Sequence, residues 1–189
     1  MQKFLVLGFF FFSSLAYAQD SDQIIHTDLD GDGKPDTVQL QNYRLHIKLS
    51  SQKQPIIEPE SEGENDPPSL RVARVGFIES FDGMRYGSSY HFAYDKASRQ
   101  IQVIGMDQYS LGNAANDGSG KDSVNLQTGD YVGKWHYYDH KNEKLRAYPT
   151  INTRLKIKPI YLNDTNFNHK LNDIWYQIDQ LKTERGIDN

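Results

Sequence analysis

Four aspartates lie within nine residues near the start of the chain: Asp28, Asp30, Asp32 and Asp36. Calcium is a hard cation that prefers about six to eight oxygen ligands at roughly 2.3–2.6 Å, and closely spaced aspartates supply such oxygens. Gly31 and Gly33 lie between them and permit the positive φ angles that a tightly wrapped backbone can need. Without a cation, four like charges this close together would repel one another. The stretch therefore predicts a calcium site.

The spacing of these aspartates matches the order in which a calcium loop presents its ligands. With the first aspartate at position 1, the other three fall at positions 3, 5 and 9. Lys34 falls at position 7, from which such a loop offers a backbone carbonyl oxygen. A helix–loop–helix site has a bidentate glutamate at position 12, whereas this chain has Gln39 there, within an alternating strand pattern. The spacing thus favours a calcium loop that leads into a strand.

The stretch DLDGDGKPDTVQL, residues 28–40, closely resembles the calcium loops of FG-GAP and VCBS-type repeats, in which this pattern feeds directly into a β-strand. The resemblance implies calcium ligands from Asp28, Asp30, Asp32, the main chain of Lys34, and Asp36. Such repeats usually occur in series, because a lone unit cannot bury its own faces. This chain has one full copy, and residues 118–126 echo it without most of the carboxylates. A full propeller is therefore not expected.

The remaining chemistry-bearing residues form no familiar catalytic motif. The chain has no cysteine, which excludes thiol catalysis. His136 and His140 are four residues apart, and in a strand this spacing places them about 13 Å apart, too far to share an ion. Asp107 and His91 have the chemistry of an acid–base pair, but nothing in the sequence brings them together. The sequence therefore predicts no catalytic residue.

Aromatic residues are abundant for a chain of this size. Most of them are expected in the core or in cross-strand pairs. Tyrosine is also favoured where a contact is half wet, since it has an apolar ring and a polar tip. Five aromatic residues from two aromatic-rich stretches are therefore candidates for a recognition surface: Tyr86, Tyr90, Trp135, Tyr137 and Tyr138.

Alternating apolar residues dominate the middle of the chain and predict antiparallel strands joined by short turns. The alternation after the aspartates changes phase at Gln41–Asn42, which predicts a tight hairpin there. Apolar residues recur three and four apart at the carboxyl end and predict one helix over about 166–184. The expected fold is mainly β: an antiparallel meander, as a sandwich or a partly open barrel, with one C-terminal α-helix.

Two segments lack a strand pattern. Residues 51–69 contain four prolines and five acidic residues and have few apolar groups, which predicts a mobile acidic loop. Residues 112–122, GNAANDGSGKD, are rich in small and polar residues and are expected to form a flexible loop.

The amino-terminal residues 1–18 have the layout of a secretory signal peptide. Lys3 precedes an apolar stretch, and small residues at Ala16 and Ala18 predict cleavage after Ala18. Residues 19–189 are then expected to form one domain with no membrane span, in the periplasm or secreted. Loss of Lys3 takes the net charge from −4 to −5, which disfavours a nucleic-acid partner.

Two functional hypotheses follow from these features. The first is an exported, calcium-stabilised binding protein that contacts another macromolecule, with a periplasmic or envelope protein as partner. Immunity or inhibitor proteins fit this profile by analogy, since they are small, exported and acidic. The alternative is a calcium-dependent hydrolase that acts on envelope polymer or sugar, with two carboxylates as acid and base about 5–10 Å apart.

Overall fold

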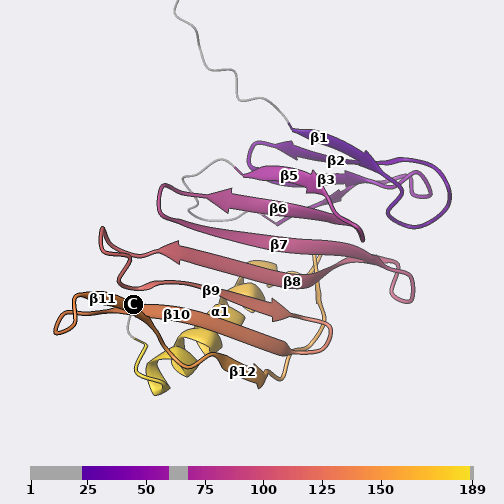
Figure 1. Ribbon diagram of the computed structural model, residues 1–189. Coiled ribbons are helices and arrows are strands. Elements are labelled where there is room, and N and C mark those ends of the chain that lie inside the picture. Colours follow the sequence, from indigo (N-terminus) through magenta and orange to yellow (C-terminus); the bar gives the residue numbers. More distant parts are fainter. Residues whose placement is uncertain (1–22, 60–67, 188–189) are drawn as a thin grey trace, which may run out of the picture.

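The computed structural model describes residues 23–59 and 68–187, and within them the chain forms two antiparallel sheets and one C-terminal helix (Figure 1). The predicted signal peptide at residues 1–18 lies outside these residues. The mainly β prediction is confirmed, and among the described residues neither sheet closes into a barrel.

The smaller sheet has four strands in chain order: β1 (Ile24–Thr27), β2 (Asp36–Gln41), β3 (Arg44–Lys48) and β4 (Ile56–Ile57). The hairpin predicted at Gln41–Asn42 is confirmed, since Gln41 pairs with Arg44 across a two-residue turn. Asn42 and Tyr43 have φ angles of 51° and 59°, as a type I′ turn requires at both central positions. One face of this hairpin is buried, because alternate residues of β2 and β3 enter the core.

The larger sheet has nine strands. A path of seven runs in the order β11-β10-β9-β8-β7-β6-β5, while β12 pairs with β10 and β13 pairs with β8. Their bounds are β5 (Ser69–Val72), β6 (Phe77–Asp82), β7 (Tyr86–Asp95), β8 (Gln100–Leu111), β9 (Ser119–Asn125), β10 (Asp130–Asp139), β11 (Lys144–Ala147), β12 (Ile151–Arg154) and β13 (Ile160–Tyr161). The register of β7 and β8 shifts at His91/Phe92, and this irregularity lets Val103 and Met106, an odd number of residues apart on β8, both be fully buried.

The helix α1 (Phe167–Glu184) matches the predicted range and lies across one face of the larger sheet (Figure 1). Its buried residues recur every three or four positions and form a single stripe: Phe167, Leu171, Ile174, Ile178 and Lys182. The first four belong to the same core as the buried residues of both sheets. Within the described chain, no helix has the length and apolar character to cross a bilayer.

Two predicted loops differ from the structure. In the segment 51–69, Ile56–Ile57 forms β4 against β3, and Glu58 is buried with its carboxylate accepting the Leu45 amide. Residues 60–67 of that segment lie outside the described residues. The segment 112–122 is a loop only in part, because β9 begins at Ser119. Glycines and polar residues obscured this strand, which pairs with β8 on one side and β10 on the other.

Candidate metal centre and neighbouring polar sites

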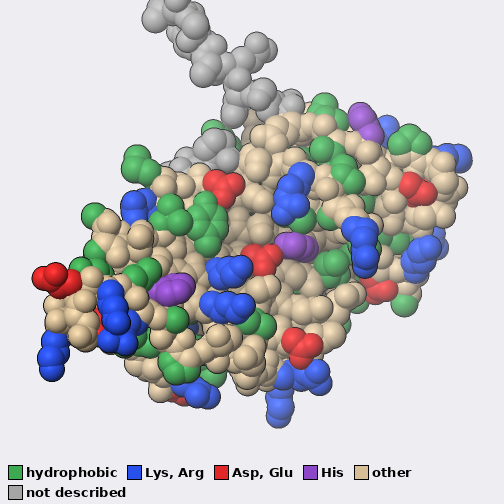
Figure 2. Space-filling model, viewed as in Figure 1, with side chains coloured by type: hydrophobic (Ala, Val, Ile, Leu, Met, Phe, Trp, Pro, Cys, Tyr) green, Lys and Arg blue, Asp and Glu red, His purple; other side chains and the backbone are tan. Residues whose placement is uncertain are grey.

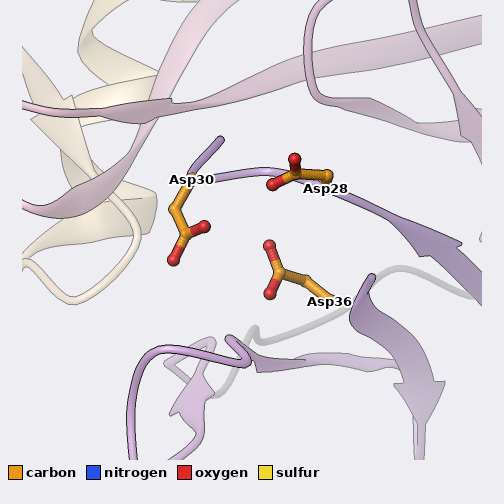
Figure 3. Close-up of side chains that lie close together, drawn as sticks. All are labelled: Asp28, Asp30 and Asp36. Carbon is orange, nitrogen blue, oxygen red and sulfur yellow. The ribbon is translucent and has the colours of Figure 1, made fainter. Parts of the chain in front are cut away.

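Three of the predicted calcium ligands converge at the end of the smaller sheet. Each of Asp28, Asp30 and Asp36 offers one carboxylate oxygen, and these oxygens lie within 4.8 Å of one another (Figure 3). Asp28 and Asp30 come from the loop between β1 and β2, and Asp36 is the first residue of β2. Two oxygens bound to one calcium ion lie at most about 5.2 Å apart, because each is within about 2.6 Å of it. The group could therefore hold a metal ion of calcium's size.

The loop wraps around the Asp28 carboxylate. The amide of Gly31 donates to one oxygen of Asp28 at 2.7 Å, and the amide of Gly33 donates to the other at 2.9 Å. Both glycines have positive φ angles, 78° and 83°, a conformation that costs other residues about 1–2 kcal/mol. The predicted role of the two glycines is thereby confirmed in the backbone.

Asp36 joins three parts of the smaller sheet. It is fully buried, and its two oxygens accept the amides of Leu29 and Ser50, each at 2.7 Å. Ser51, the residue after Ser50, donates a hydrogen bond from its hydroxyl to the Asp30 carboxylate. Ser50 and Ser51 follow β3, so their contacts tie the end of the first hairpin to the aspartate loop. Sequence reasoning missed both serines, because nothing local to them indicates that β3 ends beside the aspartates.

Asp32 and Lys34 remain predicted ligands. The Asp32 carboxylate lies outside the group of three and accepts the Ser50 hydroxyl at 2.7 Å and the Lys34 amide at 2.8 Å. These two hydrogen bonds, the one from Ser50 first, hold the pKa of Asp32 below its usual range. Asp32 is therefore an ionised carboxylate beside the group of three and stays a predicted ligand.

A buried charge network lies between the larger sheet and α1. Asp122, on β9, is 1% exposed and accepts hydrogen bonds from Tyr131 Oη at 2.7 Å, Trp135 Nε1 at 2.8 Å and Gln108 Nε2 at 2.6 Å. Lys182 Nζ, on α1, lies 3.5 Å from the same carboxylate. Burial, followed by the Asp122 hydrogen bond, raises the pKa of Tyr131 well above its usual value.

The five aromatic candidates do not share one surface. Tyr86 is exposed and Trp135 is buried, and both line a pocket beside the carboxyl end of α1. Tyr90 accepts a long hydrogen bond from the α1 tryptophan, on the core side of the sheet. Tyr137 and Tyr138 are consecutive in β10, so their side chains point to opposite faces. Only Tyr86 and Trp135 are therefore brought together.

The structure also joins one acid–base pair that the sequence left apart. His91 Nε2 lies 2.7 Å from an Asp107 oxygen across β7 and β8. Burial alone would raise the pKa of Asp107, but hydrogen bonds from His91 and Ser123 and the charges of His91 and Arg71 hold it below its usual range. A general acid needs a raised pKa, so this carboxylate is suited to orienting His91 and not to giving up a proton.

Comparison of the chain with models of known protein families, with curated proteins and with solved structures gives no match in any of the three. The FG-GAP and VCBS resemblance therefore remains a likeness of residues 28–40, and the conclusions about the site depend on its own geometry.

Proposed function

We propose that this protein is an exported, calcium-stabilised binding protein that contacts another macromolecule in the periplasm or envelope. The observation that carries the proposal is the convergence of the Asp28, Asp30 and Asp36 carboxylates within 4.8 Å. Each of these groups already accepts hydrogen bonds from the chain, and a carboxylate has about four lone-pair positions, so each keeps room for an ion. The hard oxygen donors favour calcium over softer metals.

Calcium in this loop acts on the stability of the smaller sheet. The loop connects β1 to β2, and its contacts with Ser50 and Ser51 extend to the end of β3. An ion that binds all three carboxylates offsets their mutual repulsion and holds these strand ends together. The ion therefore has a structural role. Because it binds the folded protein and not the unfolded chain, it raises the stability of the folded protein.

The larger sheet supplies the surface for a macromolecular partner. Its central strands are long, with 10 residues in β7 and 12 in β8, and α1 covers only one of its faces (Figure 1). The opposite face carries acidic, basic and histidine side chains in open view (Figure 2). This open face and the pocket beside the carboxyl end of α1 are the surfaces available for contact with a periplasmic or envelope protein, including the immunity or inhibitor role expected from the sequence.

A calcium-dependent hydrolase of envelope polymer or sugar remains the second candidate. The observation that favours it is an open pocket of about 460 Å³ whose lining includes Asp117 and Asp179. Both carboxylates have partners in the fold: Asp117 accepts the Tyr138 amide, and Asp179 pairs with Lys182 at 2.8 Å. Turnover of peptidoglycan or oligosaccharide that is lost in both Asp117→Asn and Asp179→Asn would establish this alternative over the first.

The experiment for the first candidate is cross-linking of the mature protein in its native envelope, with and without EGTA, followed by mass spectrometry. A single protein partner whose yield falls with EGTA, and falls equally in Asp28→Ala/Asp30→Ala, is the expected result. Asp173→Asn, an exposed acidic position on α1, is the matched control and retains the partner. Absence of a protein partner, together with measured turnover, would overturn the proposal.

A further inference from the structure

The pocket beside the carboxyl end of α1 combines aromatic and charged side chains. Its volume is about 460 Å³, within the range of about 300–1,000 Å³ that is usual for ligand pockets. Strands β7, β8 and β10 and the loop after β8 form its walls together with α1. The lining includes three aromatic and three charged residues: Tyr86, Tyr109, Trp135, Asp117, Asp179 and Lys182.

Exposed apolar side chains lie at one edge of this pocket, where β7 begins. Met84 is 94% exposed in the turn between β6 and β7, and Tyr86 is 62% exposed at the start of β7. Tyr109 and Leu111 are also exposed on β8, but they alternate with Gln108 and Ser110, so their side chains lie on the other face of the sheet. Tyrosine and methionine are both enriched at protein contact sites.

This surface is held in place before any partner binds. The Arg85 guanidinium donates to the carbonyls of Leu111, Gly112 and Asn113, at 3.1, 2.7 and 2.8 Å, which fixes the loop after β8. The Tyr109 hydroxyl donates to Asp82 at 3.0 Å. A preorganised surface loses less conformational entropy on binding, so the same contacts give a higher affinity.

The charges in and beneath the pocket are mainly negative. Asp117 and Asp179 line it and Asp122 lies below, while the opposite charges are the Lys182 ammonium and the Arg85 guanidinium, which binds the lining residues Gly112 and Asn113. Lys182 is 2% exposed, sits 4.4 Å above the Trp135 ring and is bound by Asp179 and Asp122, so its charge is already compensated. The Asp179 side chain is 57% exposed, and its carboxylate can accept further hydrogen bonds from a group in the pocket. The complement to this surface is a cation.

We propose that this pocket receives an arginine side chain from a loop of a protein partner, while Met84 and Tyr86 pack beside it. This rests on the proposed function, since it describes how the macromolecular partner is held. Arginine matches the site better than lysine does, because a guanidinium stacks on a tyrosine ring and hydrogen-bonds a carboxylate through two N–H groups. Arginine and tyrosine are also the side chains that dominate binding energy at protein interfaces.

The chemistry of the pocket is tested first with N-acetyl-arginine amide as the probe, by NMR titration of the calcium-loaded mature protein. The Trp135 indole N–H and the Tyr86 ring are expected to shift in a saturable way. N-acetyl-citrulline amide has the same shape without the charge and is expected to bind at least tenfold more weakly. Equal binding of citrulline, preferential binding of N-acetyl-glutamate amide or of a monosaccharide, or no saturable shift would each overturn the proposal.

Two substitutions with matched controls locate the binding. Tyr86→Ala and Asp179→Asn should each lower the affinity for the arginine probe at least tenfold. Tyr176, 64% exposed, and Asp173, with its side chain 59% exposed, both lie on α1 outside the lining, so Tyr176→Ala and Asp173→Asn should leave binding unchanged. Melting temperatures of all four variants check that each is folded. Loss of binding in the control variants, or none in the pocket variants, contradicts the assignment.

The protein partner obtained by cross-linking separates this inference from the proposed function. If the pocket is the docking site, Tyr86→Ala should weaken that complex about thirtyfold, as an interfacial anchor does. A complex of unchanged affinity overturns the pocket as the docking site and leaves the proposed function intact. Absence of any partner, with the probe still bound in the pocket, overturns the proposed function and with it the partner named here.

Discussion

Replacement of Asp122 by Asn tests whether the buried charge network holds α1 on the larger sheet. The substitution keeps the size of the side chain and removes its charge. It leaves the Lys182 ammonium with only the more exposed Asp179 as a counter-charge. It also converts one of the two acceptor oxygens into a donor, so hydrogen bonds from Tyr131, Trp135 or Gln108 are lost as well.

The cost follows from these contacts. Removing one partner of a buried ion pair destabilises a protein by about 3–5 kcal/mol. Lys182 keeps Asp179 at 2.8 Å, but the hydrogen bonds lost from Tyr131, Trp135 or Gln108 add to the cost, so a value in this range is expected. A domain of this size shifts its melting temperature by about 2–4 °C for each kcal/mol, so the expected fall is about 6–20 °C. Typical stabilities are about 5–15 kcal/mol, and the variant is therefore expected to fold.

Urea unfolding of a double-mutant cycle with Lys182→Met measures the coupling directly. Lys182→Met should lower the free energy of unfolding less than Asp122→Asn does. The Asp122 carboxylate would still accept hydrogen bonds from three neutral donors. The double variant should cost less than the sum of the two, because it leaves no stranded ammonium beside the amide. Additive losses, or an Asp122→Asn variant within about 0.5 kcal/mol of wild type, would refute the reasoning.

Three further substitutions probe the core, the first hairpin and the pH dependence. Ile178→Ala removes a fully buried side chain of α1 and should cost about 2–5 kcal/mol in urea unfolding, whereas a loss below about 1 kcal/mol would contradict the packing. Tyr43→Gly relieves a positive φ angle in the type I′ turn and should raise stability by up to about 1 kcal/mol; a destabilised variant would speak against the turn type. The Asn142 side chain and amide and the Arg146 guanidinium lower the pKa of Asp139 to about 2. Because this is below the unfolded value of about 3.9, its contribution is present above pH 4 and lost as the pH falls toward 2. Asp139→Asn should therefore flatten the pH dependence of unfolding between about pH 5 and 2, and an unchanged slope would contradict the shift.

Local patterns made the strands, the first hairpin and the helix predictable. The change of phase at Gln41–Asn42 is a property of adjacent residues, and so is the α1 stripe at spacings of three and four. The convergence of Asp28, Asp30 and Asp36 followed from spacing as well, because a short loop with two glycines must curl around its own carboxylates.

The contacts that join distant segments could not be predicted from one sequence. Asp122 lies in a glycine-rich stretch that was predicted to be a loop, and its partner Lys182 is 60 residues away on α1. A charged residue within an apolar helix stripe was the one available signal of this pair. Ser50 and Ser51 join the aspartate loop only because β3 ends beside it, a fact of sheet geometry that their own neighbours in sequence do not encode.

Isothermal titration calorimetry of the mature protein with calcium chloride tests the central claim most directly. The expected result is saturable heat with one ion per chain, and its loss in Asp28→Ala/Asp30→Ala but not in Asp173→Asn. At calcium concentrations about 100 times the dissociation constant, binding should add about 2.7 kcal/mol to the stability of the wild type and of Asp173→Asn, but not to that of the double variant. If wild type gives no saturable heat, or the double variant binds as wild type does, then the three converging carboxylates do not form a calcium site.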